Sequence, residues 1–285
     1  MNRAKLASLI IVLALAISGS TANAAANEPV SQGLSISPAI NYLGVKPGSA
    51  INSAIELFNG TDNFIQVNLA IKQFSVRNYS YEYLFAPPAH NWIKLSQSQL
   101  QLAPDQRLNV DYAISVPPGS APGGNYFTLI ASTKFVTGNI VSIGQAASLI
   151  YLTVAGNLQY SSKIISSSTE HFSFGSNINY NFTILPKGNV YSYVYTYAHL
   201  GKITTSQIAH IVYPNAIRKI SGTIGHPTIP GLYKITYGYR SSSNMVALKS
   251  SWVIYFPPWL LALIIVVVLI MMQLKFKPTR LRRRP

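Results

Sequence analysis

Strict alternation of apolar and polar residues is the feature that most limits what this chain can fold into. It runs through three segments, at residues 65–72, 107–116 and 177–184. In each segment nearly every second residue is a large apolar or aromatic one, and most residues between them are polar. A period of two gives a strand one buried face and one wet face, as in antiparallel sheets packed in pairs. The pattern predicts an all-β chain.

Turn-forming residues separate these segments, and no soluble amphipathic helix of convincing length interrupts them. The turns are rich in Pro, Gly and Asn, which favour tight backbone reversals. The clearest are Lys46-Pro47-Gly48, Asn59-Gly60, Pro117-Pro118-Gly119, Pro122-Gly123-Gly124 and Pro186-Lys187-Gly188-Asn189. The region is too long for one sandwich of roughly 100 residues. We therefore expect two Ig-like antiparallel β-sandwiches, over residues 28–156 and 160–256, followed by a single transmembrane α-helix.

The N-terminus has the pattern of a cleavable export signal. Arg3 and Lys5 are followed by an apolar run over residues 6–17, and Ala22-Asn23-Ala24 supplies small residues at a cleavage site. The apolar run is too short for a hydrocarbon core that needs roughly 20 residues. Residues 1–24 are therefore predicted to be a signal peptide, and an uncleaved N-terminal anchor is the alternative.

The C-terminal region predicts a membrane anchor over residues 257–274, because no charged residue occurs between 251 and 274. Trp259 and Leu260 begin its apolar stretch, and Leu274 and Lys275 end it. An aromatic ring at the outer edge suits the headgroup layer, and a terminal Lys reaches back toward the interface. A buried core helix is the alternative for this segment.

Residues 275–285 form a basic tail without one acid. Besides two lysines, it contains Arg280, Arg282, Arg283 and Arg284. The positive-inside rule places such a tail in the cytoplasm. We therefore expect a single-pass protein of the cell membrane, with its N-terminal ectodomain outside and its tail inside.

Charge and cysteine content narrow the function classes. The formal net charge is +15, but eight of the 22 Lys and Arg residues belong to the predicted signal and tail. The others are scattered singly, so no nucleic-acid patch is formed, although a mildly basic ectodomain favours anionic surroundings such as cell-wall polymers. The chain has no cysteine, which excludes disulfides and thiol chemistry.

The titratable residues give no catalytic pattern. Seven acids and five histidines show no paired-carboxylate motif, no zinc-ligand spacing, no nucleophile elbow and no phosphate loop. Sequence spacing does not test a triad that assembles in space. We expect no enzyme activity, no cofactor and no metal site.

Tyrosines supply the candidate binding residues, since a tyrosine offers an apolar ring and a polar tip to a partner. Four line one side of a predicted strand, and three lie in a predicted long loop: Tyr191, Tyr193, Tyr195 and Tyr197, then Tyr79, Tyr81 and Tyr83. The alternative for the strand is that this side packs inward. The alternative for the loop is that it packs over the end of its own core.

The chain resembles the WxL-interacting proteins of Gram-positive cell surfaces in short motifs spread over most of its length. The first-half motifs are Ser37-Pro38, Val45-Lys46-Pro47-Gly48, Phe58-Asn59, Trp92-Ile93-Lys94-Leu95, Leu102-Ala103-Pro104, Ile114-Ser115-Val116-Pro117 and Pro122-Gly123-Gly124-Asn125-Tyr126. The second-half motifs are Lys187-Gly188-Asn189-Val190, Val212-Tyr213-Pro214, Gly231-Leu232-Tyr233, Tyr237-Gly238 and Trp252-Val253-Ile254.

This resemblance implies an Ig-like domain that binds peptidoglycan and a second sandwich that binds another surface protein or a host ligand, both tethered by the C-terminal helix. The expected partners are therefore the membrane, peptidoglycan or another cell-wall polymer, and another surface protein. The first domain also looks like a pilus-chaperone Ig domain. The alternative function is thus an assembly factor that acts by β-strand addition, which requires an unpaired edge strand.

Overall fold

The computed structural model describes residues 33–137, 140–205, 207–242 and 246–275. Within them the chain is all-β apart from one C-terminal helix, and the strands form β-sandwich sheets, as the alternation predicts. The predicted signal peptide at 1–24 and the tail residues Arg280, Arg282, Arg283 and Arg284 lie outside the described residues.

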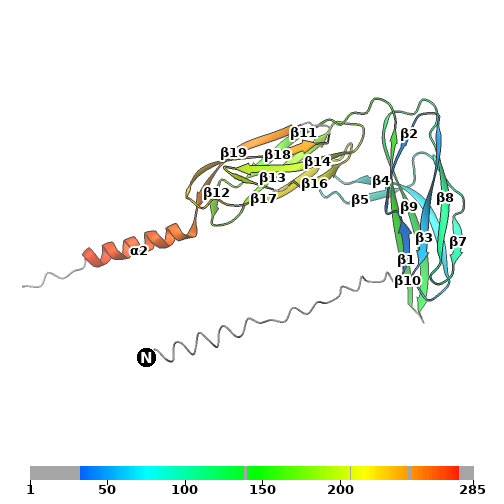
Figure 1. The fold of residues 1–285 in the computed structure, drawn as a ribbon, viewed down its shortest axis with the longest axis horizontal. Helices are drawn as coiled ribbons and strands as arrows, with labels where there is room; N and C mark the ends of the chain where they lie inside the picture. The colour runs from blue at the N-terminus through cyan, green and yellow to red at the C-terminus, as the bar shows by residue number, and fades with distance from the viewer. Residues whose placement is uncertain (1–32, 138–139, 206, 243–245, 276–285) are drawn as a thin grey trace, which may run out of the picture.

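The first sandwich is built from strands β1 to β10 (Figure 1). One sheet has the order β1 (Leu34–Ser37), β3 (Ala50–Asn59), β8 (Arg107–Ser115) and β6 (Ile93–Leu95). The other has the order β2 (Ile40–Val45), β10 (Ile140–Val154), β9 (Gly123–Thr137), β4 (Ile65–Val76) and β5 (Tyr83–Ala86), with β7 (Gln99–Leu102) also paired to β4.

The second sandwich is built from strands β11 to β19. Its smaller sheet has the order β11 (Ser162–Thr169), β13 (Ile178–Pro186) and β17 (Arg218–Ile224). Its larger sheet, called the outer sheet below, has the order β12 (Phe172–Phe174), β19 (Val246–Phe256), β18 (Gly231–Ser241), β14 (Ser192–Leu200) and β15 (Ile203–Thr204), with β16 (Ala209–Val212) also paired to β14.

The alternating segments supply both cores. In β8 the side chains of Val110, Tyr112 and Ile114 are buried between the two sheets of the first sandwich. In β13 those of Ile178 and Phe182 are buried in the same way in the second sandwich. Burying one such side chain contributes about 1.5–3 kcal/mol to the stability of the fold. The side chains that the alternation places on the inner faces therefore stabilise each pair of sheets.

The first strand segment changes sheets within a few residues. β1 pairs antiparallel with β3 in one sheet, and β2 pairs parallel with β10 in the other. The peptide bond between Ser37 and Pro38, which joins the two segments, is cis. This crossover puts β2 beside only part of β10.

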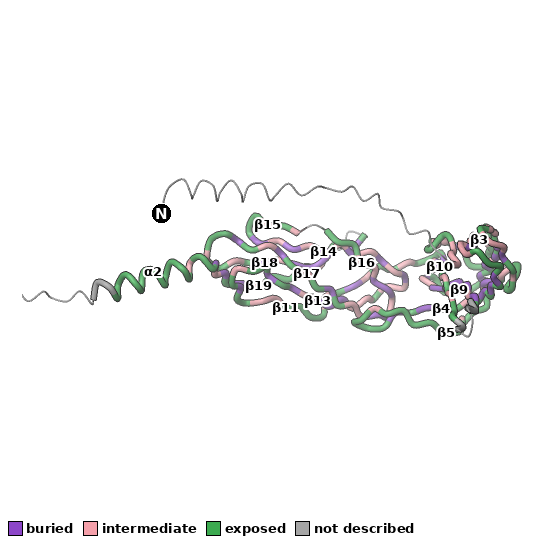
Figure 2. The backbone as a smooth tube through the Cα atoms, turned by 90° about the horizontal axis from the view of Figure 1, so that it is seen from below, coloured by how far each residue is buried: buried purple, intermediate pink, exposed green. Residues whose placement is uncertain are grey.

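The two sandwiches meet at an angle, as Figure 1 shows, and are joined by residues 155–161 between β10 and β11. Buried residues lie in the region where the two sandwiches touch (Figure 2). A third cluster of buried residues, with Phe74, Tyr126 and Tyr151 from the first sandwich and Tyr213 and Ala216 from the second, fills this contact. The two domains therefore share a packed interface.

Helix α2 (Pro258–Lys275) follows the second sandwich and contains the predicted anchor residues Trp259, Leu260, Leu274 and Lys275. The residues from Leu261 to Met272 are all exposed, and Figure 2 colours this part of the helix accordingly, so the alternative of a buried core helix does not hold. Among the described residues, no helix combines the length and apolar character needed to cross a membrane. The predicted transmembrane helix over residues 257–274 is therefore unsupported.

Candidate functional site

The most open backbone of the first sandwich lies along strand β10. This strand pairs with β9 from Ile140 to Val154, but β2 covers its other side only from Leu149 onward. No described strand pairs with the outer side of Ile140–Ser148. We call this stretch the free edge.

The hydrogen-bond pattern shows which backbone groups face outward there. The N–H of Leu149 donates to the carbonyl of Ala39, and the N–H of Ala155 donates to the carbonyl of Val45, each at 2.9 Å. Backbone groups alternate sides along a strand. The N–H groups of Gln145 and Ala147 therefore point out from the free edge, and those of even-numbered residues point toward β9.

Side chains along the free edge are small on one face, and the other face carries Ile143, Gln145 and Ala147. Gly144, Ala146 and Ser148 lie on the core face, which Ile150 continues as a fully buried residue. Ile143 lies on the opposite face and is 65% exposed. The side chains of β10 itself would thus offer an incoming strand little steric resistance on the core side, and Ile143 would offer it an apolar contact on the other.

Strand β19 has a similar open edge in the second sandwich. β12 pairs with it only from Ile254 to Phe256, while β18 pairs with it from Val246 to Tyr255. The N–H of Ile254 donates to the carbonyl of His171 at 2.9 Å. Even-numbered residues of β19, such as Ser250, therefore point their N–H groups outward.

The interface between the sandwiches is a cluster of tyrosines. The hydroxyls of Tyr151 and Tyr213 form a short hydrogen bond with each other. The ring centroids of Tyr126 and Tyr213 are 5.2 Å apart at 84°, and those of Tyr151 and Tyr191 are 5.1 Å apart at 68°. Such edge-on pairs contribute about 0.5–1.5 kcal/mol beyond the area that they bury. These contacts cross from one sandwich to the other and hold them together.

The predicted aromatic loop contributes to the same interface. The N–H of Tyr79 donates to the carbonyl of Ile217 at 2.8 Å, and the hydroxyl of Tyr81 accepts from the N–H of Tyr213 at 3.1 Å. Tyr79 and Tyr81 have φ values of 67° and 61°, a region that residues with a Cβ rarely adopt. The side chain of Asn78 also accepts from the N–H of Ile217 at 2.8 Å. The loop is therefore attached to the second sandwich by backbone and side-chain hydrogen bonds.

A cation lies under this loop. The guanidinium of Arg218 is 4.3 Å from the centre of the Tyr81 ring and 3.2 Å from Nδ1 of His210. It also donates to the carbonyl of Ile211. Burial lowers the pKa of Arg218 and, together with that nearby positive charge, the pKa of His210. The Tyr81 ring and the backbone carbonyl stabilise this half-buried cation.

Asn189 ties the linker to both sandwiches. Its Nδ2 donates to the carbonyls of Pro122 and Asn157, each at 3.0 Å, and its Oδ1 accepts from the N–H of Gln159 at 2.8 Å. Its own carbonyl accepts from the N–H of Gly124 at 2.8 Å. One side chain thus fixes the loop before β9, the linker and the loop before β14.

The structure divides the seven candidate tyrosines between different surroundings. On β14 the buried side is formed by Ser192, Val194 and Thr196, so the tyrosine side faces outward, contrary to the inward-packing alternative. The tyrosines with interface contacts are Tyr191, Tyr193 and Tyr81, and those on the open part of the outer sheet are Tyr195 and Tyr197. Tyr79 and Tyr83 are more exposed but also contact the interface, Tyr79 through its backbone N–H to Ile217 and Tyr83 through its ring against Phe74.

Two functional features were missed from sequence. The free edge carries the small-residue run from Gly144 to Ser148, which has little apolar alternation to draw notice. Asn189 belongs to the turn-forming run Pro186-Lys187-Gly188-Asn189, and its role depends on the carbonyls of Pro122 and Asn157, which lie far away in the chain. Neither feature leaves a periodic pattern.

Burial raises the pKa of Tyr126, Tyr151 and Tyr213 above the ordinary tyrosine value. These hydroxyls hydrogen-bond with each other or with the backbone, so their raised pKa values result from packing in the interface. Within the described residues, no group of three or more His, Asp or Glu side chains is placed to hold a metal ion.

Comparison with known proteins gives a likeness in fold and no family. No family model matches the chain, and no curated protein matches it. Among solved structures, it is similar to the CsuC–CsuE chaperone–tip adhesion subunit complex of Csu pili from Acinetobacter baumannii (12% identity, TM-score 0.41, covering 78% of this chain and 98% of that chain). It is also similar to the class 5 fimbriae chaperone CfaA (11% identity, TM-score 0.42, covering 78% and 99%). A third is the E. coli chaperone DraB (9% identity, TM-score 0.38, covering 77% and 96%). At these values the likeness carries no argument about function.

Proposed function

We propose that this protein is a non-catalytic binding protein that captures an extended segment of a partner protein along the free edge of β10. The observation that supports this proposal is the unpaired outer side of Ile140–Ser148, in a strand that is otherwise paired on both sides. Strand addition at such an edge gains main-chain hydrogen bonds, and the flanking side chains select the partner.

The geometry indicates the kind of segment that fits. Residues that approach Gly144 and Ala146 on the core face meet short side chains, so large apolar side chains at every second position have room there. Residues on the opposite face meet Ile143, which is 65% exposed. The expected ligand is an extended segment with alternating apolar residues, supplied by another surface protein.

Natural proteins usually protect an edge strand with charge, proline or a covering loop. No Lys, Arg, Asp, Glu or Pro occurs between Ile140 and Val154. An unprotected edge is a liability unless a partner covers it. This argument favours strand addition over a structural role alone.

A proline substitution on the free edge tests the proposal. Gln145→Pro removes an outward N–H and leaves the pairing with β9 intact, while Gln145→Ala keeps the donor. A photo-crosslinking residue at position 143 should capture a segment of a surface protein in Gln145→Ala and lose most of it in Gln145→Pro.

Ser250→Pro makes the same change on β19 and is the matched control. Equal capture by Gln145→Pro and Gln145→Ala would remove the proposal. Loss of capture only in Ser250→Pro would move the site to the second sandwich.

The resemblance to WxL-interacting proteins, with the peptidoglycan binding that it implies, is a separate proposal that rests on sequence motifs. Retention of the purified ectodomain on peptidoglycan sacculi at modest ionic strength tests it. If the protein is washed from the sacculi as readily as a non-binding control protein, this proposal is wrong.

Attachment to a membrane through helix α2 is also a proposal. The exposed apolar side chains from Leu261 to Met272 support contact with lipid, and the basic tail supports a cytoplasmic end. Alkaline carbonate extraction of membranes gives the test. Complete release of the chain into the supernatant would contradict an integral anchor.

A further inference from the structure

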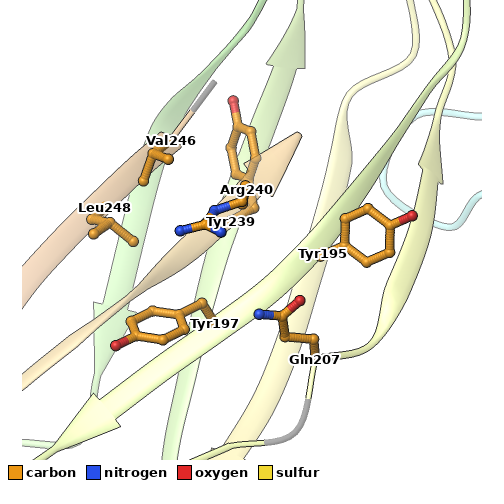
Figure 3. A pocket seen from close by; sticks show the side chains of 7 residues that line it. All are labelled: Tyr195, Tyr197, Gln207, Tyr239, Arg240, Val246 and Leu248. Atoms are coloured by element: carbon orange, nitrogen blue, oxygen red, sulfur yellow. The ribbon is translucent and has the colours of Figure 1, made fainter. Parts of the chain in front are cut away.

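A hollow lies on the exposed face of the outer sheet of the second sandwich (Figure 3), whereas the free edge belongs to the first sandwich. Tyr195 and Tyr197 of β14 border it on one side, and Val246 and Leu248 of β19 border it on the other. Arg240 of β18 lies between them. The hollow has a volume of about 210 Å³, smaller than the ~300–1,000 Å³ of sites that enclose a drug-sized ligand.

A glycine interrupts the row of side chains between two of the residues that line this hollow. Gly238 pairs with Tyr197 on one side and with Leu248 on the other, so a row of side chains is interrupted between them. Its φ is 155°, and a Cβ at this position would lie 2.0 Å from the carbonyl oxygen of Ala247. The backbone itself therefore keeps the hollow open.

The lining combines aromatic rings with a cation. The rings of Tyr195 and Tyr197 are half-buried, and the side chain of Arg240 is exposed. The ion pairs among the described residues are Arg77–Glu82 and Arg107–Glu56, both in the first sandwich. Arg240 thus has no carboxylate partner within the described part of the chain, and its guanidinium is available to an anion.

Charge is divided unequally between the sandwiches. Residues 161–256 contain eight Lys and Arg residues and a single acid, Glu170, whereas residues 33–156 contain six and five. The excess positive charge attracts anions to the second sandwich and raises their local concentration. An anionic ligand is therefore favoured at the hollow over a neutral or cationic one.

We propose that this hollow binds an acidic sugar unit of a surface polysaccharide. The pyranose ring lies against Tyr195 and Tyr197, because the apolar face of a sugar packs on aromatic rings. The sugar carboxylate accepts two parallel hydrogen bonds from the guanidinium of Arg240. The amide of Gln207, also in the lining, binds a hydroxyl. This site is distinct from the strand edge of β10 and does not depend on it.

Affinity electrophoresis of the purified full-length protein tests the site with polygalacturonate as the probe. Polyglutamate has a similar charge without a sugar ring, and methyl-esterified polygalacturonate has the ring without the charge. The acidic polysaccharide is expected to bind at least tenfold more tightly than either control. Equal binding of polyglutamate would reduce the effect to general charge attraction and overturn the proposal.

Substitutions locate the site. Arg240→Gln and Tyr197→Ala should each weaken binding of polygalacturonate about tenfold, and Arg240→Lys should weaken it less than Arg240→Gln. Lys163→Gln removes the same charge on β11 of the other sheet and should have little effect. If Lys163→Gln weakens binding as much as Arg240→Gln, no site exists at the hollow.

Two controls separate this result from other causes. Circular dichroism and the thermal midpoint check that each variant folds, and Arg240→Gln is the variant least connected to the core. Gln145→Pro blocks the free edge and should leave binding of polygalacturonate unchanged. The sugar site and the strand edge can therefore fail independently.

Discussion

The hydroxyl of Tyr126 in the first sandwich accepts a hydrogen bond of 2.8 Å from the backbone N–H of Tyr191 in the second. Tyr126 is only 9% exposed, so this hydrogen bond is shielded from water. It fixes the chain just before β14 against β9. A side-chain hydroxyl of one domain thus accepts the hydrogen bond of a backbone N–H of the other inside the domain interface.

Tyr126→Phe should destabilise the protein by about 1–3 kcal/mol, because the N–H of Tyr191 loses its partner in a buried place. The ring and its packing are kept. Urea unfolding measures the free energy, and Tyr79→Phe is the control because Tyr79 is 57% exposed. Equal stability of the two variants would show that water replaces the lost hydroxyl.

Alkaline pH should weaken the interface. Burial holds the pKa of Tyr126, Tyr151 and Tyr213 above the ordinary value of about 10. The folded state therefore favours the neutral phenols. Their contribution is fully present below pH ~10, where unfolded tyrosines are also neutral, and it is lost as pH rises through the folded pKa values.

Above pH ~10, each of these tyrosines can lower the free energy of unfolding by at most about 1.4 kcal/mol per pH unit. Denaturant unfolding at several pH values between 9 and 12 gives the slope. The triple variant Tyr126→Phe, Tyr151→Phe and Tyr213→Phe should have a shallower slope than the wild type. Identical slopes would exclude these groups as the cause.

Asn189→Ala should weaken the attachment of the two sandwiches to each other without unfolding either one. The change removes three hydrogen bonds, to Pro122, Asn157 and Gln159, and each is worth about 0.5–1.5 kcal/mol. Small-angle X-ray scattering should show a broader distribution of interdomain distances. Asn181→Ala, which removes a surface hydrogen bond to Ser168, should leave the scattering unchanged.

Gly238→Ala should be among the most damaging substitutions in the second sandwich. The new Cβ would meet the carbonyl oxygen of Ala247 at 2.0 Å, and this oxygen is backbone and cannot rotate away. We expect a loss of more than about 3 kcal/mol, since overpacking and an unfavourable φ act together. Gly44→Ala, with no atom within 4 Å of the new Cβ, is the control. A thermal midpoint for Gly238→Ala close to that of Gly44→Ala would sink this expectation.

The sequence predicted the β-sandwich class well because period-two alternation is a local property. Val110, Tyr112 and Ile114 face inward for the same reason that they alternate with polar neighbours. The free edge could not be predicted in this way, because it depends on where β2 begins to pair with β10. That pairing joins residues more than 100 positions apart, and local pattern carries no information about it.

The tyrosines show the same limit. Alternation placed Tyr191, Tyr193, Tyr195 and Tyr197 on one side of a strand, and the structure agrees. Only the contact with the first sandwich separates the interface tyrosines, Tyr191 and Tyr193, from the open ones. Tyr193 shares a hydrogen bond of 2.7 Å with Tyr42, and burial raises its pKa to about 12. Neither fact is visible from the spacing.

Strand β10 carries Ile143 near one end and Tyr151 near the other, eight residues apart on a single extended segment. At about 3.3 Å per residue this is roughly 26 Å of continuous backbone. We expect an occupant of the proposed site at Ile140–Ser148 to restrain the other end of the strand as well, where Tyr151 meets Tyr213. Slower amide hydrogen exchange at the domain contact would then indicate that a partner segment occupies the free edge, about 26 Å away along the same strand.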